Sequence, residues 1–164
     1  MRCIAGLGNP GARYKLTRHN VGFLYLDWLA TIHKFAFQTE SDCELWRGEI
    51  QGEKITLIKP MTYMNLSGGP VSRVMGYYKL TELLVIHDEV DLPFGEIRKK
   101  TGGGEAGHNG LKSISEALGT KDYSRVRIGV GKNPLMDTAD WVLSRFTDEE
   151  LAALPRLFEK ITLN

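Results

Sequence analysis

A short apolar run at the start of the chain leads directly into residues 6–11, which read Gly-Leu-Gly-Asn-Pro-Gly and match the spacing Gly-x-Gly-x-x-Gly. In dinucleotide-binding folds this pattern joins a strand to a helix whose N-terminus faces a pyrophosphate. Here Pro10 disfavours a helical conformation at Asn9, and the polar residues 12–20 are typical of a loop. Asp27 falls within a helical pattern, so no acid ends a second strand where a ribose ligand belongs. The motif therefore predicts a strand, a loop and then a helix, and it argues against a nicotinamide or flavin site.

Strand-like and helix-like segments alternate along most of the chain. Apolar patterning and turn residues predict strands over residues 2–7, 44–50, 54–58, 83–86, 95–100 and 125–130, with a hairpin turn at 51–53. Helical spacing predicts helices over residues 21–32, 67–78, 111–118 and 148–160. We expect Ser67 to cap the second helix and Pro155 to disturb the last. This order predicts an α/β fold: a single three-layer domain over residues 1–164 with a mixed, mostly parallel central sheet flanked by helices.

Composition bounds the partners and the compartment. The 164 residues suffice for one full core, and a net charge of +1 means that a nucleic acid would have to meet a local basic patch. Cys3 and Cys43 supply neither a disulfide framework nor a four-ligand zinc site, so we expect both to be small buried hydrophobic groups. The chain shows no signal-like leader and no run of eighteen apolar residues, which predicts a cytoplasmic location and no membrane partner.

Candidate catalytic residues stand in predicted loops or at the ends of predicted elements: Asn9, His19, Asn65, Asp88 and Asn109. Several of these loops leave the carboxyl ends of strands, so we expect one shared cleft. His19 can act as a general base near neutral pH, with Asp88 accepting its other N–H. The three carboxamides can orient an ester carbonyl, a water or a ribose hydroxyl. Each residue also has a structural interpretation, since His19 could cap the following helix and the others are common in turns.

A cluster of cations stands next to a glycine-rich segment. Arg98, Lys99 and Lys100 precede residues 102–104, which are all glycine, while Arg125 and Arg127 share one face of a predicted strand. A glycine-rich loop with a flanking lysine is typical of a phosphate cradle. Lysines on an edge strand also protect it against aggregation, so both interpretations stay open.

A metal-assisted hydrolase is a second possible reading of the acidic and histidine residues. The candidate ligands suit zinc or manganese by type, and they are His87, Asp88, Glu89, Asp91 and His108. They lack a fixed ligand spacing such as His-Glu-x-x-His, so we predict no metal site.

Five motifs occur in order along the chain: Gly-Leu-Gly-Asn-Pro-Gly (6–11), Thr-Arg-His-Asn-Val-Gly (17–22), Pro-Met-Thr-Tyr-Met-Asn-Leu-Ser-Gly (60–68), His-Asp-Glu-Val-Asp-Leu-Pro (87–93) and Gly-His-Asn-Gly-Leu-Lys (107–112). Together they resemble the bacterial-type peptidyl-tRNA hydrolase family, from Met1 to about Phe146. The resemblance implies a monomeric enzyme of translation that needs no metal or other cofactor. Its substrate would be peptidyl-tRNA, and the bond cut would be the ester between the peptide and the 3′-terminal ribose.

The resemblance also implies a role for each matching residue. His19 would be the catalytic base and Asp88 its partner, while the three asparagines Asn9, Asn65 and Asn109 would position substrate or water. The implied binding residues are Tyr14 and Met64 in the substrate cleft, His108 as a supporting cleft histidine, and Lys100 and Arg127 against the 5′-phosphate region of the tRNA.

The chain departs from the family pattern in two places. The family has a longer C-terminal helical segment beside the cleft, whereas this sequence ends at Asn164, so we expect a raised KM with little change in kcat. Ala106 stands where the family mostly has glycine, which would stiffen the neighbouring loop, and residues 132–137 are expected to form a mobile edge of the cleft. A tRNA-binding module without catalysis remains the alternative that a shorter C-terminus favours.

Overall fold

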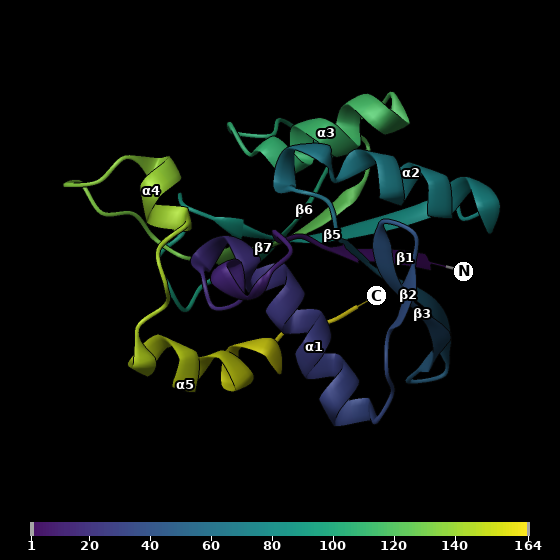
Figure 1. The fold of residues 1–164 in the computed structure, drawn as a ribbon, viewed down its shortest axis with the longest axis horizontal. Helices are drawn as coiled ribbons and strands as arrows, with labels where there is room; N and C mark the ends of the chain where they lie inside the picture. Colours follow the sequence, from purple (N-terminus) through teal and green to yellow (C-terminus); the bar gives the residue numbers. More distant parts are fainter. Residues whose placement is uncertain (1, 164) are drawn as a thin grey trace.

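Seven strands form one mixed sheet in the order β2-β3-β4-β1-β5-β7-β6 in the computed structural model, which describes residues 2–163 (Figure 1). The four central strands are parallel: β4 (Glu53–Pro60), β1 (Arg2–Gly6), β5 (Glu82–Glu89) and β7 (Ser124–Gly129). The outer strands pair antiparallel: β2 (Gln38–Glu40), β3 (Cys43–Ile50) and β6 (Ile97–Thr101). The mixed α/β sheet predicted from the sequence is confirmed.

Helices cover both faces of the sheet. Figure 1 shows α2 (Gly68–Tyr77) and α3 (Asn109–Leu118) on one side, and α1 (Val21–His33) and α5 (Asp148–Phe158) on the other. Side chains alternate along each strand, so Ile4 packs with the core under α1 and α5, while Cys3 and Ala5 pack with the core under α2 and α3. Two separate cores therefore hold three layers together.

Gly6 of the opening motif and Gly22 of α1 allow the helix to pack closely on the sheet. A Cβ on Gly22 would lie 2.5 Å from the carbonyl oxygen of Ile86, and one on Gly6 would lie 2.6 Å from that of Gly22. The N-terminus of α1 therefore lies directly against the carboxyl ends of β1 and β5. This close approach brings the turn before α1, which carries His19, beside the end of β5, which carries Asp88.

Some expected elements differ in detail. The short strand β2 and the short helix α4 (Thr138–Val142) were not expected, and 3-10 turns interrupt the predicted loops at Ala12–Tyr14, Arg18–Asn20 and Met64–Leu66. The expectation that Ser67 caps α2 is wrong, because its hydroxyl donates to the carbonyl of Met64 (2.8 Å). Helix α5 continues past Pro155 to Phe158, since Leu157 and Phe158 bury their side chains in the core.

Both cysteines are buried and unpaired, as expected. Arg125 is fully buried and donates to the carbonyls of Gly103 (2.9 Å), Gly104 (2.5 Å) and Lys121 (3.2 Å), so it anchors the glycine-rich loop from within. Arg125 is therefore not available to bind a phosphate, although it lies in the cluster of cations that the sequence places near the glycine-rich loop. Within residues 2–163, none of the helices has the length and apolarity needed to cross a membrane.

Candidate active site

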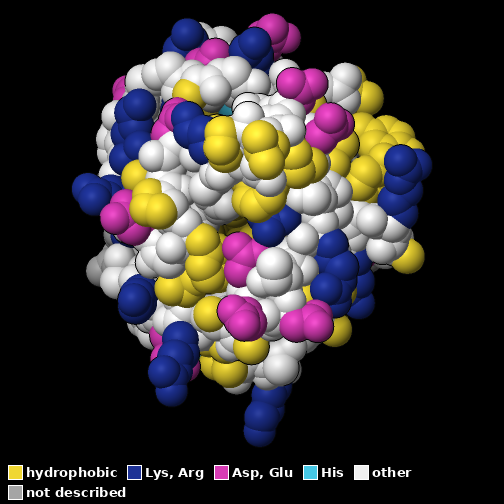
Figure 2. Space-filling view, turned by 90° about the vertical axis from the view of Figure 1, so that its left-hand side faces the viewer, with side chains coloured by type: hydrophobic (Ala, Val, Ile, Leu, Met, Phe, Trp, Pro, Cys, Tyr) yellow, Lys and Arg dark blue, Asp and Glu magenta, His cyan; other side chains and the backbone are white. Residues whose placement is uncertain are grey.

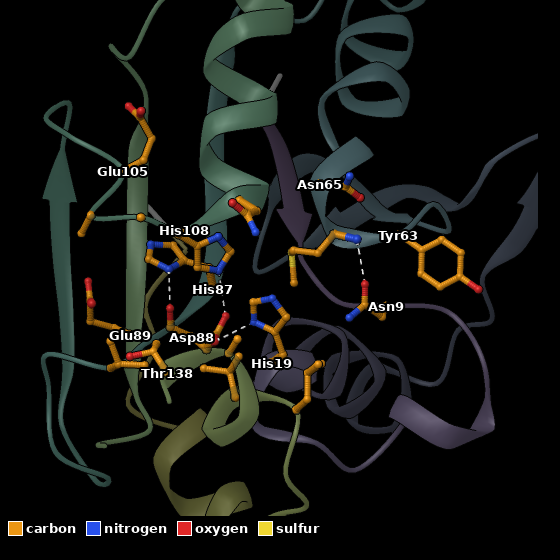
Figure 3. A pocket seen from close by; sticks show the side chains of 18 residues that line it. Asn9, His19, Tyr63, Asn65, His87, Asp88, Glu89, Glu105, His108 and Thr138 are labelled. Atoms are coloured by element: carbon orange, nitrogen blue, oxygen red, sulfur yellow. Dashed lines mark hydrogen bonds and ion pairs between the residues drawn. The ribbon is translucent and has the colours of Figure 1, made fainter. Parts of the chain in front are cut away.

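An open cleft of about 450 Å³ lies at the carboxyl ends of the central strands. All five residues predicted as catalytic line it, together with two of the predicted binding residues: Asn9, His19, Asn65, Asp88, Asn109, Met64 and His108. Figure 3 shows His19, Asp88 and His108 close together on one side of this cleft, with Asn9 and Asn65 on the other. One shared cleft was predicted, and the structure forms it.

Asp88 lies between two histidines. One carboxylate oxygen, Oδ2, is 2.8 Å from Nδ1 of His19, and the other, Oδ1, is 2.8 Å from Nε2 of His108 (Figure 3). The side chain of Asp88 is almost fully buried, whereas that of His19 is 13% exposed and so remains reachable from the cleft. A buried carboxylate that accepts from two rings fixes the orientation of both.

The contacts of His108 determine which of its ring nitrogens carries hydrogen. Its Nδ1 caps α3 by accepting from the backbone N–H groups of Gly110 (3.1 Å) and Leu111 (3.3 Å). The proton of the neutral ring must then be on Nε2, which donates to Asp88. Because the second oxygen of Asp88 faces Nδ1 of His19, that nitrogen is the donor, and Nε2 of His19 keeps its lone pair for the cleft.

Burial and neighbouring charges shift the pKa values of His19 and Asp88. Burial lowers the pKa of His19, but the charge of Asp88 and the hydrogen bond to it raise that pKa, and the net result lies above the ordinary value of 6.5. Burial raises the pKa of Asp88, but His19 and His108 together lower it by more than burial raises it. The carboxyl therefore has a pKa well below its usual range. The pair therefore combines an ionised carboxylate with a histidine whose pKa is raised above its ordinary value.

His87 is buried and stays neutral. Burial, and then the neighbouring His108, lower the pKa of His87 to about 3. Its Nδ1 lies 2.8 Å from the backbone oxygen of Asp88 and donates to it, while its Nε2 has no hydrogen-bond partner among the described residues. His87 thus supports the end of β5 from beneath the cleft.

The ligand atoms of His19, Asp88 and His108 lie within 4.8 Å of one another, and among residues 2–163 they alone form a group suited to a metal ion. They are arranged as donor and acceptor pairs, since each nitrogen meets its own carboxylate oxygen at 2.8 Å. A metal bound here would replace both hydrogen bonds with coordination of deprotonated nitrogens. The hydrogen-bonded arrangement fits acid–base chemistry directly.

Asn9 is held by three hydrogen bonds on its side of the cleft. Its Oδ1 accepts from the backbone N–H of Met64 (2.7 Å), and its own backbone exchanges two hydrogen bonds of 2.8 Å with the side chain of Asn20. The Oδ1 contact fixes the flip of the amide, so Nδ2 faces the cleft on the side of His19 (Figure 3). The sequence pattern did not indicate this role of Asn20, although Asn20 directly follows His19 in the chain.

The predicted binding residues divide into two groups. Met64 is buried and lines the cleft beside Asn65. Tyr14, Lys100 and Arg127 do not line it: Tyr14 packs edge-on against Tyr63 with centroids 6.4 Å apart, and the other two lie on the β6 and β7 strands. Their predicted contacts with tRNA remain predictions.

The rim of the cleft is apolar. Tyr63 is 58% exposed and Leu143 is 44% exposed, and both line the opening. Figure 2 shows this end of the molecule, where hydrophobic side chains gather in the central part while Lys and Arg lie mainly toward the edges. Helix α4 forms one wall of the cleft through Thr138 and Val142. This wall was not predicted, because the expected mobile edge covers residues 132–137, which precede α4 and do not line the cleft.

Ala106 adopts a left-handed conformation with φ of +49° on the cleft loop. We expect Ala106→Gly to raise the free energy of unfolding by about 0.5–1 kcal/mol in urea denaturation, because glycine removes the steric cost of that conformation but adds freedom to the unfolded chain. Ala139→Gly is the matched control: this cleft alanine is helical, so the same substitution should lower stability by about 1 kcal/mol. A loss of stability in both variants would contradict the explanation.

A histidine that meets a buried carboxylate through Nδ1 and an open cleft through Nε2 has the geometry with which α/β hydrolytic enzymes can activate water. Comparison with known proteins gives the family: the model of the peptidyl-tRNA hydrolase family matches residues 3–163. The chain therefore belongs to the peptidyl-tRNA hydrolase family. This membership confirms the resemblance and the hydrolase activity that the five motifs predicted.

Individual relatives agree with this assignment. The chain is 49% identical over 162 residues to a peptidyl-tRNA hydrolase of Nocardia farcinica, a match that covers 96% of this chain and 84% of the relative. Identity to that of Pseudarthrobacter chlorophenolicus is 50% over 163 residues, covering 96% and 83%. A crystal structure of the enzyme from Acinetobacter baumannii matches with a TM-score of 0.89 at 35% identity, over 97% of this chain and 83% of that one.

Proposed function

We propose that the chain hydrolyses peptidyl-tRNA with His19 as the general base. The observation that carries this proposal is the 2.8 Å contact between His19 Nδ1 and Asp88, which directs Nε2 of the same ring to the cleft. The substrate is an ester between the carboxyl group of a peptide and the 3′-terminal ribose of tRNA. An ester is reactive enough that base catalysis and polarisation of its carbonyl suffice.

The reaction proceeds in two proton transfers. Nε2 of His19 takes a proton from water while the water oxygen bonds to the ester carbon, which gives a tetrahedral oxyanion. Asp88 stays ionised and stabilises the imidazolium that forms. The bond from carbon to the ribose oxygen then breaks, and the imidazolium returns its proton to that oxygen. The products are the free peptide and a tRNA with a 3′-terminal hydroxyl.

The three asparagines act on the substrate. Asn9 presents Nδ2 from a rigid position, so it suits the role of a donor to the carbonyl oxygen or the attacking water. Asn65 and Asn109 are exposed and line the cleft, Asn65 in the turn Met64–Leu66 and Asn109 as the first residue of α3, where they can orient the ribose end. One such donor contributes about 10²–10³-fold to the rate, and the base about 10²–10⁴-fold.

The tRNA would be gripped outside the cleft. Lys100 is exposed at the end of β6, and Arg98 on the same strand pairs in register with Arg127 of β7. Contacts between these cations and phosphates position the backbone without reading bases, and they give binding that weakens with salt.

Two further residues would act by supporting others. His108 holds Asp88 in place through their hydrogen bond, and Tyr14 packs against Tyr63 at the rim of the cleft. We further propose that the enzyme acts as a monomer and that it acts in the cytoplasm.

Release of the N-acyl amino acid from N-acyl-aminoacyl-tRNA tests this proposal. We expect release that persists in excess EDTA, with kcat/KM rising with pH through one ionisation above 6.5, because the base must lose its proton and its pKa is raised. Loss of activity in EDTA with recovery on adding zinc would favour a metal at the His19–Asp88–His108 group instead. Binding of tRNA without release would favour a binding module.

A further inference from the structure

The residue before the proposed base is a buried arginine. The side chain of Arg18 is only 4% exposed, and it points away from the cleft into the corner between α4 and α5. Its guanidinium donates to Ser144 Oγ (2.7 Å), to the carbonyl of Arg145 (2.8 Å) and to Glu150 Oε1 (2.7 Å). It also stacks on the ring of Trp141, 3.7 Å from the centroid. Every one of these partners belongs to the segment 141–150.

The backbone around Arg18 is tied to the same segment. Arg18 N donates to the carbonyl of Ser144 (3.1 Å), Phe146 N donates to that of Leu16 (3.0 Å), and Thr17 forms a bridge with Arg145. On its other side, the turn Arg18–Asn20 is joined to Asn9 by the paired bonds of Asn20. The short turn that carries His19 is therefore fixed from both ends.

The same segment also builds the site. Val142 and Leu143 line the cleft, and Trp141 Nε1 donates to the carbonyl of Gly131 (2.8 Å). Glu150 Oε1 accepts from Thr147 N (2.9 Å) in the capping box of α5 as well as from Arg18. One carboxylate thus joins the start of α5 to the residue next to the base.

We propose that Arg18 is a positioning residue that sets the angle at which His19 meets Asp88 and holds the α4 wall of the cleft against the base. The inference rests on the proposed function of His19. Arg18 contacts no substrate atom; it acts through the turn that it anchors. A lysine in its place keeps the charge but loses the planar fork and the stacking, so the turn would be held at fewer points.

The test compares Arg18→Lys with Glu150→Gln and Asp148→Asn. Asp148 forms an exposed ion pair with Arg145 (3.0 Å) in the same corner and does not contact Arg18, so its variant is the matched control. For Arg18→Lys we expect kcat per folded molecule to fall about tenfold to a hundredfold with KM changed less than about twofold, because small errors in the placement of a base cost that much. Glu150→Gln keeps the accepting oxygen and the capping box, so it should lose less activity.

The pH profile separates positioning from simple stabilisation. The titratable groups that meet His19 are Asp88 of β5 and His108 before α3, and loosening the Asp88 contact should move the inflection of kcat/KM to lower pH. A folded Arg18→Lys protein with the wild-type kcat and pH profile but a lower Tm would overturn the inference. If that variant does not fold, Glu150→Ala, which removes the carboxylate that accepts from Arg18, decides by the same readouts. Wild type and His19→Ala run alongside, so equal activity in these two would refute the proposed base separately.

Discussion

Replacing His19 with alanine lowers kcat for N-acyl-aminoacyl-tRNA by about 10²–10⁴-fold, because the attacking water loses its general base. KM should change little, since in the proposed function His19 acts at the reacting centre and the tRNA is held mainly through its phosphates. Single-turnover rates at saturating enzyme measure the chemical step directly. Residual hydrolysis should reflect the carbonyl-polarising donors that remain, Asn9 among them.

His33 provides the matched control for that substitution. It is an exposed histidine in the last turn of the α1 helix, so His33→Ala should keep the wild-type rate. Circular dichroism and Tm should show that both variants are folded. A His19→Ala enzyme with the wild-type rate would exclude His19 as the base.

Asp88→Asn should reduce kcat by up to about 10⁴-fold. The carboxylate accepts from both histidines, whereas a carboxamide has only one accepting oxygen, so either His19 or His108 would face an NH₂ group. Loss of the negative charge also removes what raises the pKa of His19, and burial, which lowers it, remains. The inflection of kcat/KM should therefore move to lower pH, while the plateau rate at high pH stays far below that of the wild type.

Asp91→Asn is the control for this change. Asp91 lies just beyond β5 and forms an exposed ion pair with Lys132 (2.8 Å), so its loss should leave the rate and the inflection unchanged. An Asp88→Asn variant whose inflection moves to higher pH would contradict the assigned direction of the charge effect.

The sequence was sufficient to predict that the candidate residues share one cleft. A continuous apolar run predicted a buried strand before Asp88, and the carboxyl ends of parallel strands meet at one edge of a sheet. His19 and Asp88 are 69 positions apart, yet the strand, loop and helix order alone brings their elements together. Roles of individual residues came from the five motifs, because spacing by itself leaves a loop asparagine equally suited to a turn.

Other features depend on packing that no local pattern records. Arg18 and Glu150 are 132 positions apart, and nothing near either residue indicates the other as its partner. The α4 helix has only five residues, too few to show a helical period. The strand pattern placed Arg125 on one face with Arg127, but it does not show the carbonyl partners of Arg125, which the folded glycine-rich loop supplies.

The most direct measurement follows the imidazole of His19 by NMR across pH in the free enzyme and compares its pKa with the inflection of kcat/KM. The His19→Ala spectrum assigns the resonance. We expect the two values to coincide above 6.5 in the wild type and to fall together in Asp88→Asn. A kinetic inflection that differs from the titration of His19, or that stays in place when Asp88 is changed, would contradict a base formed by His19 and Asp88.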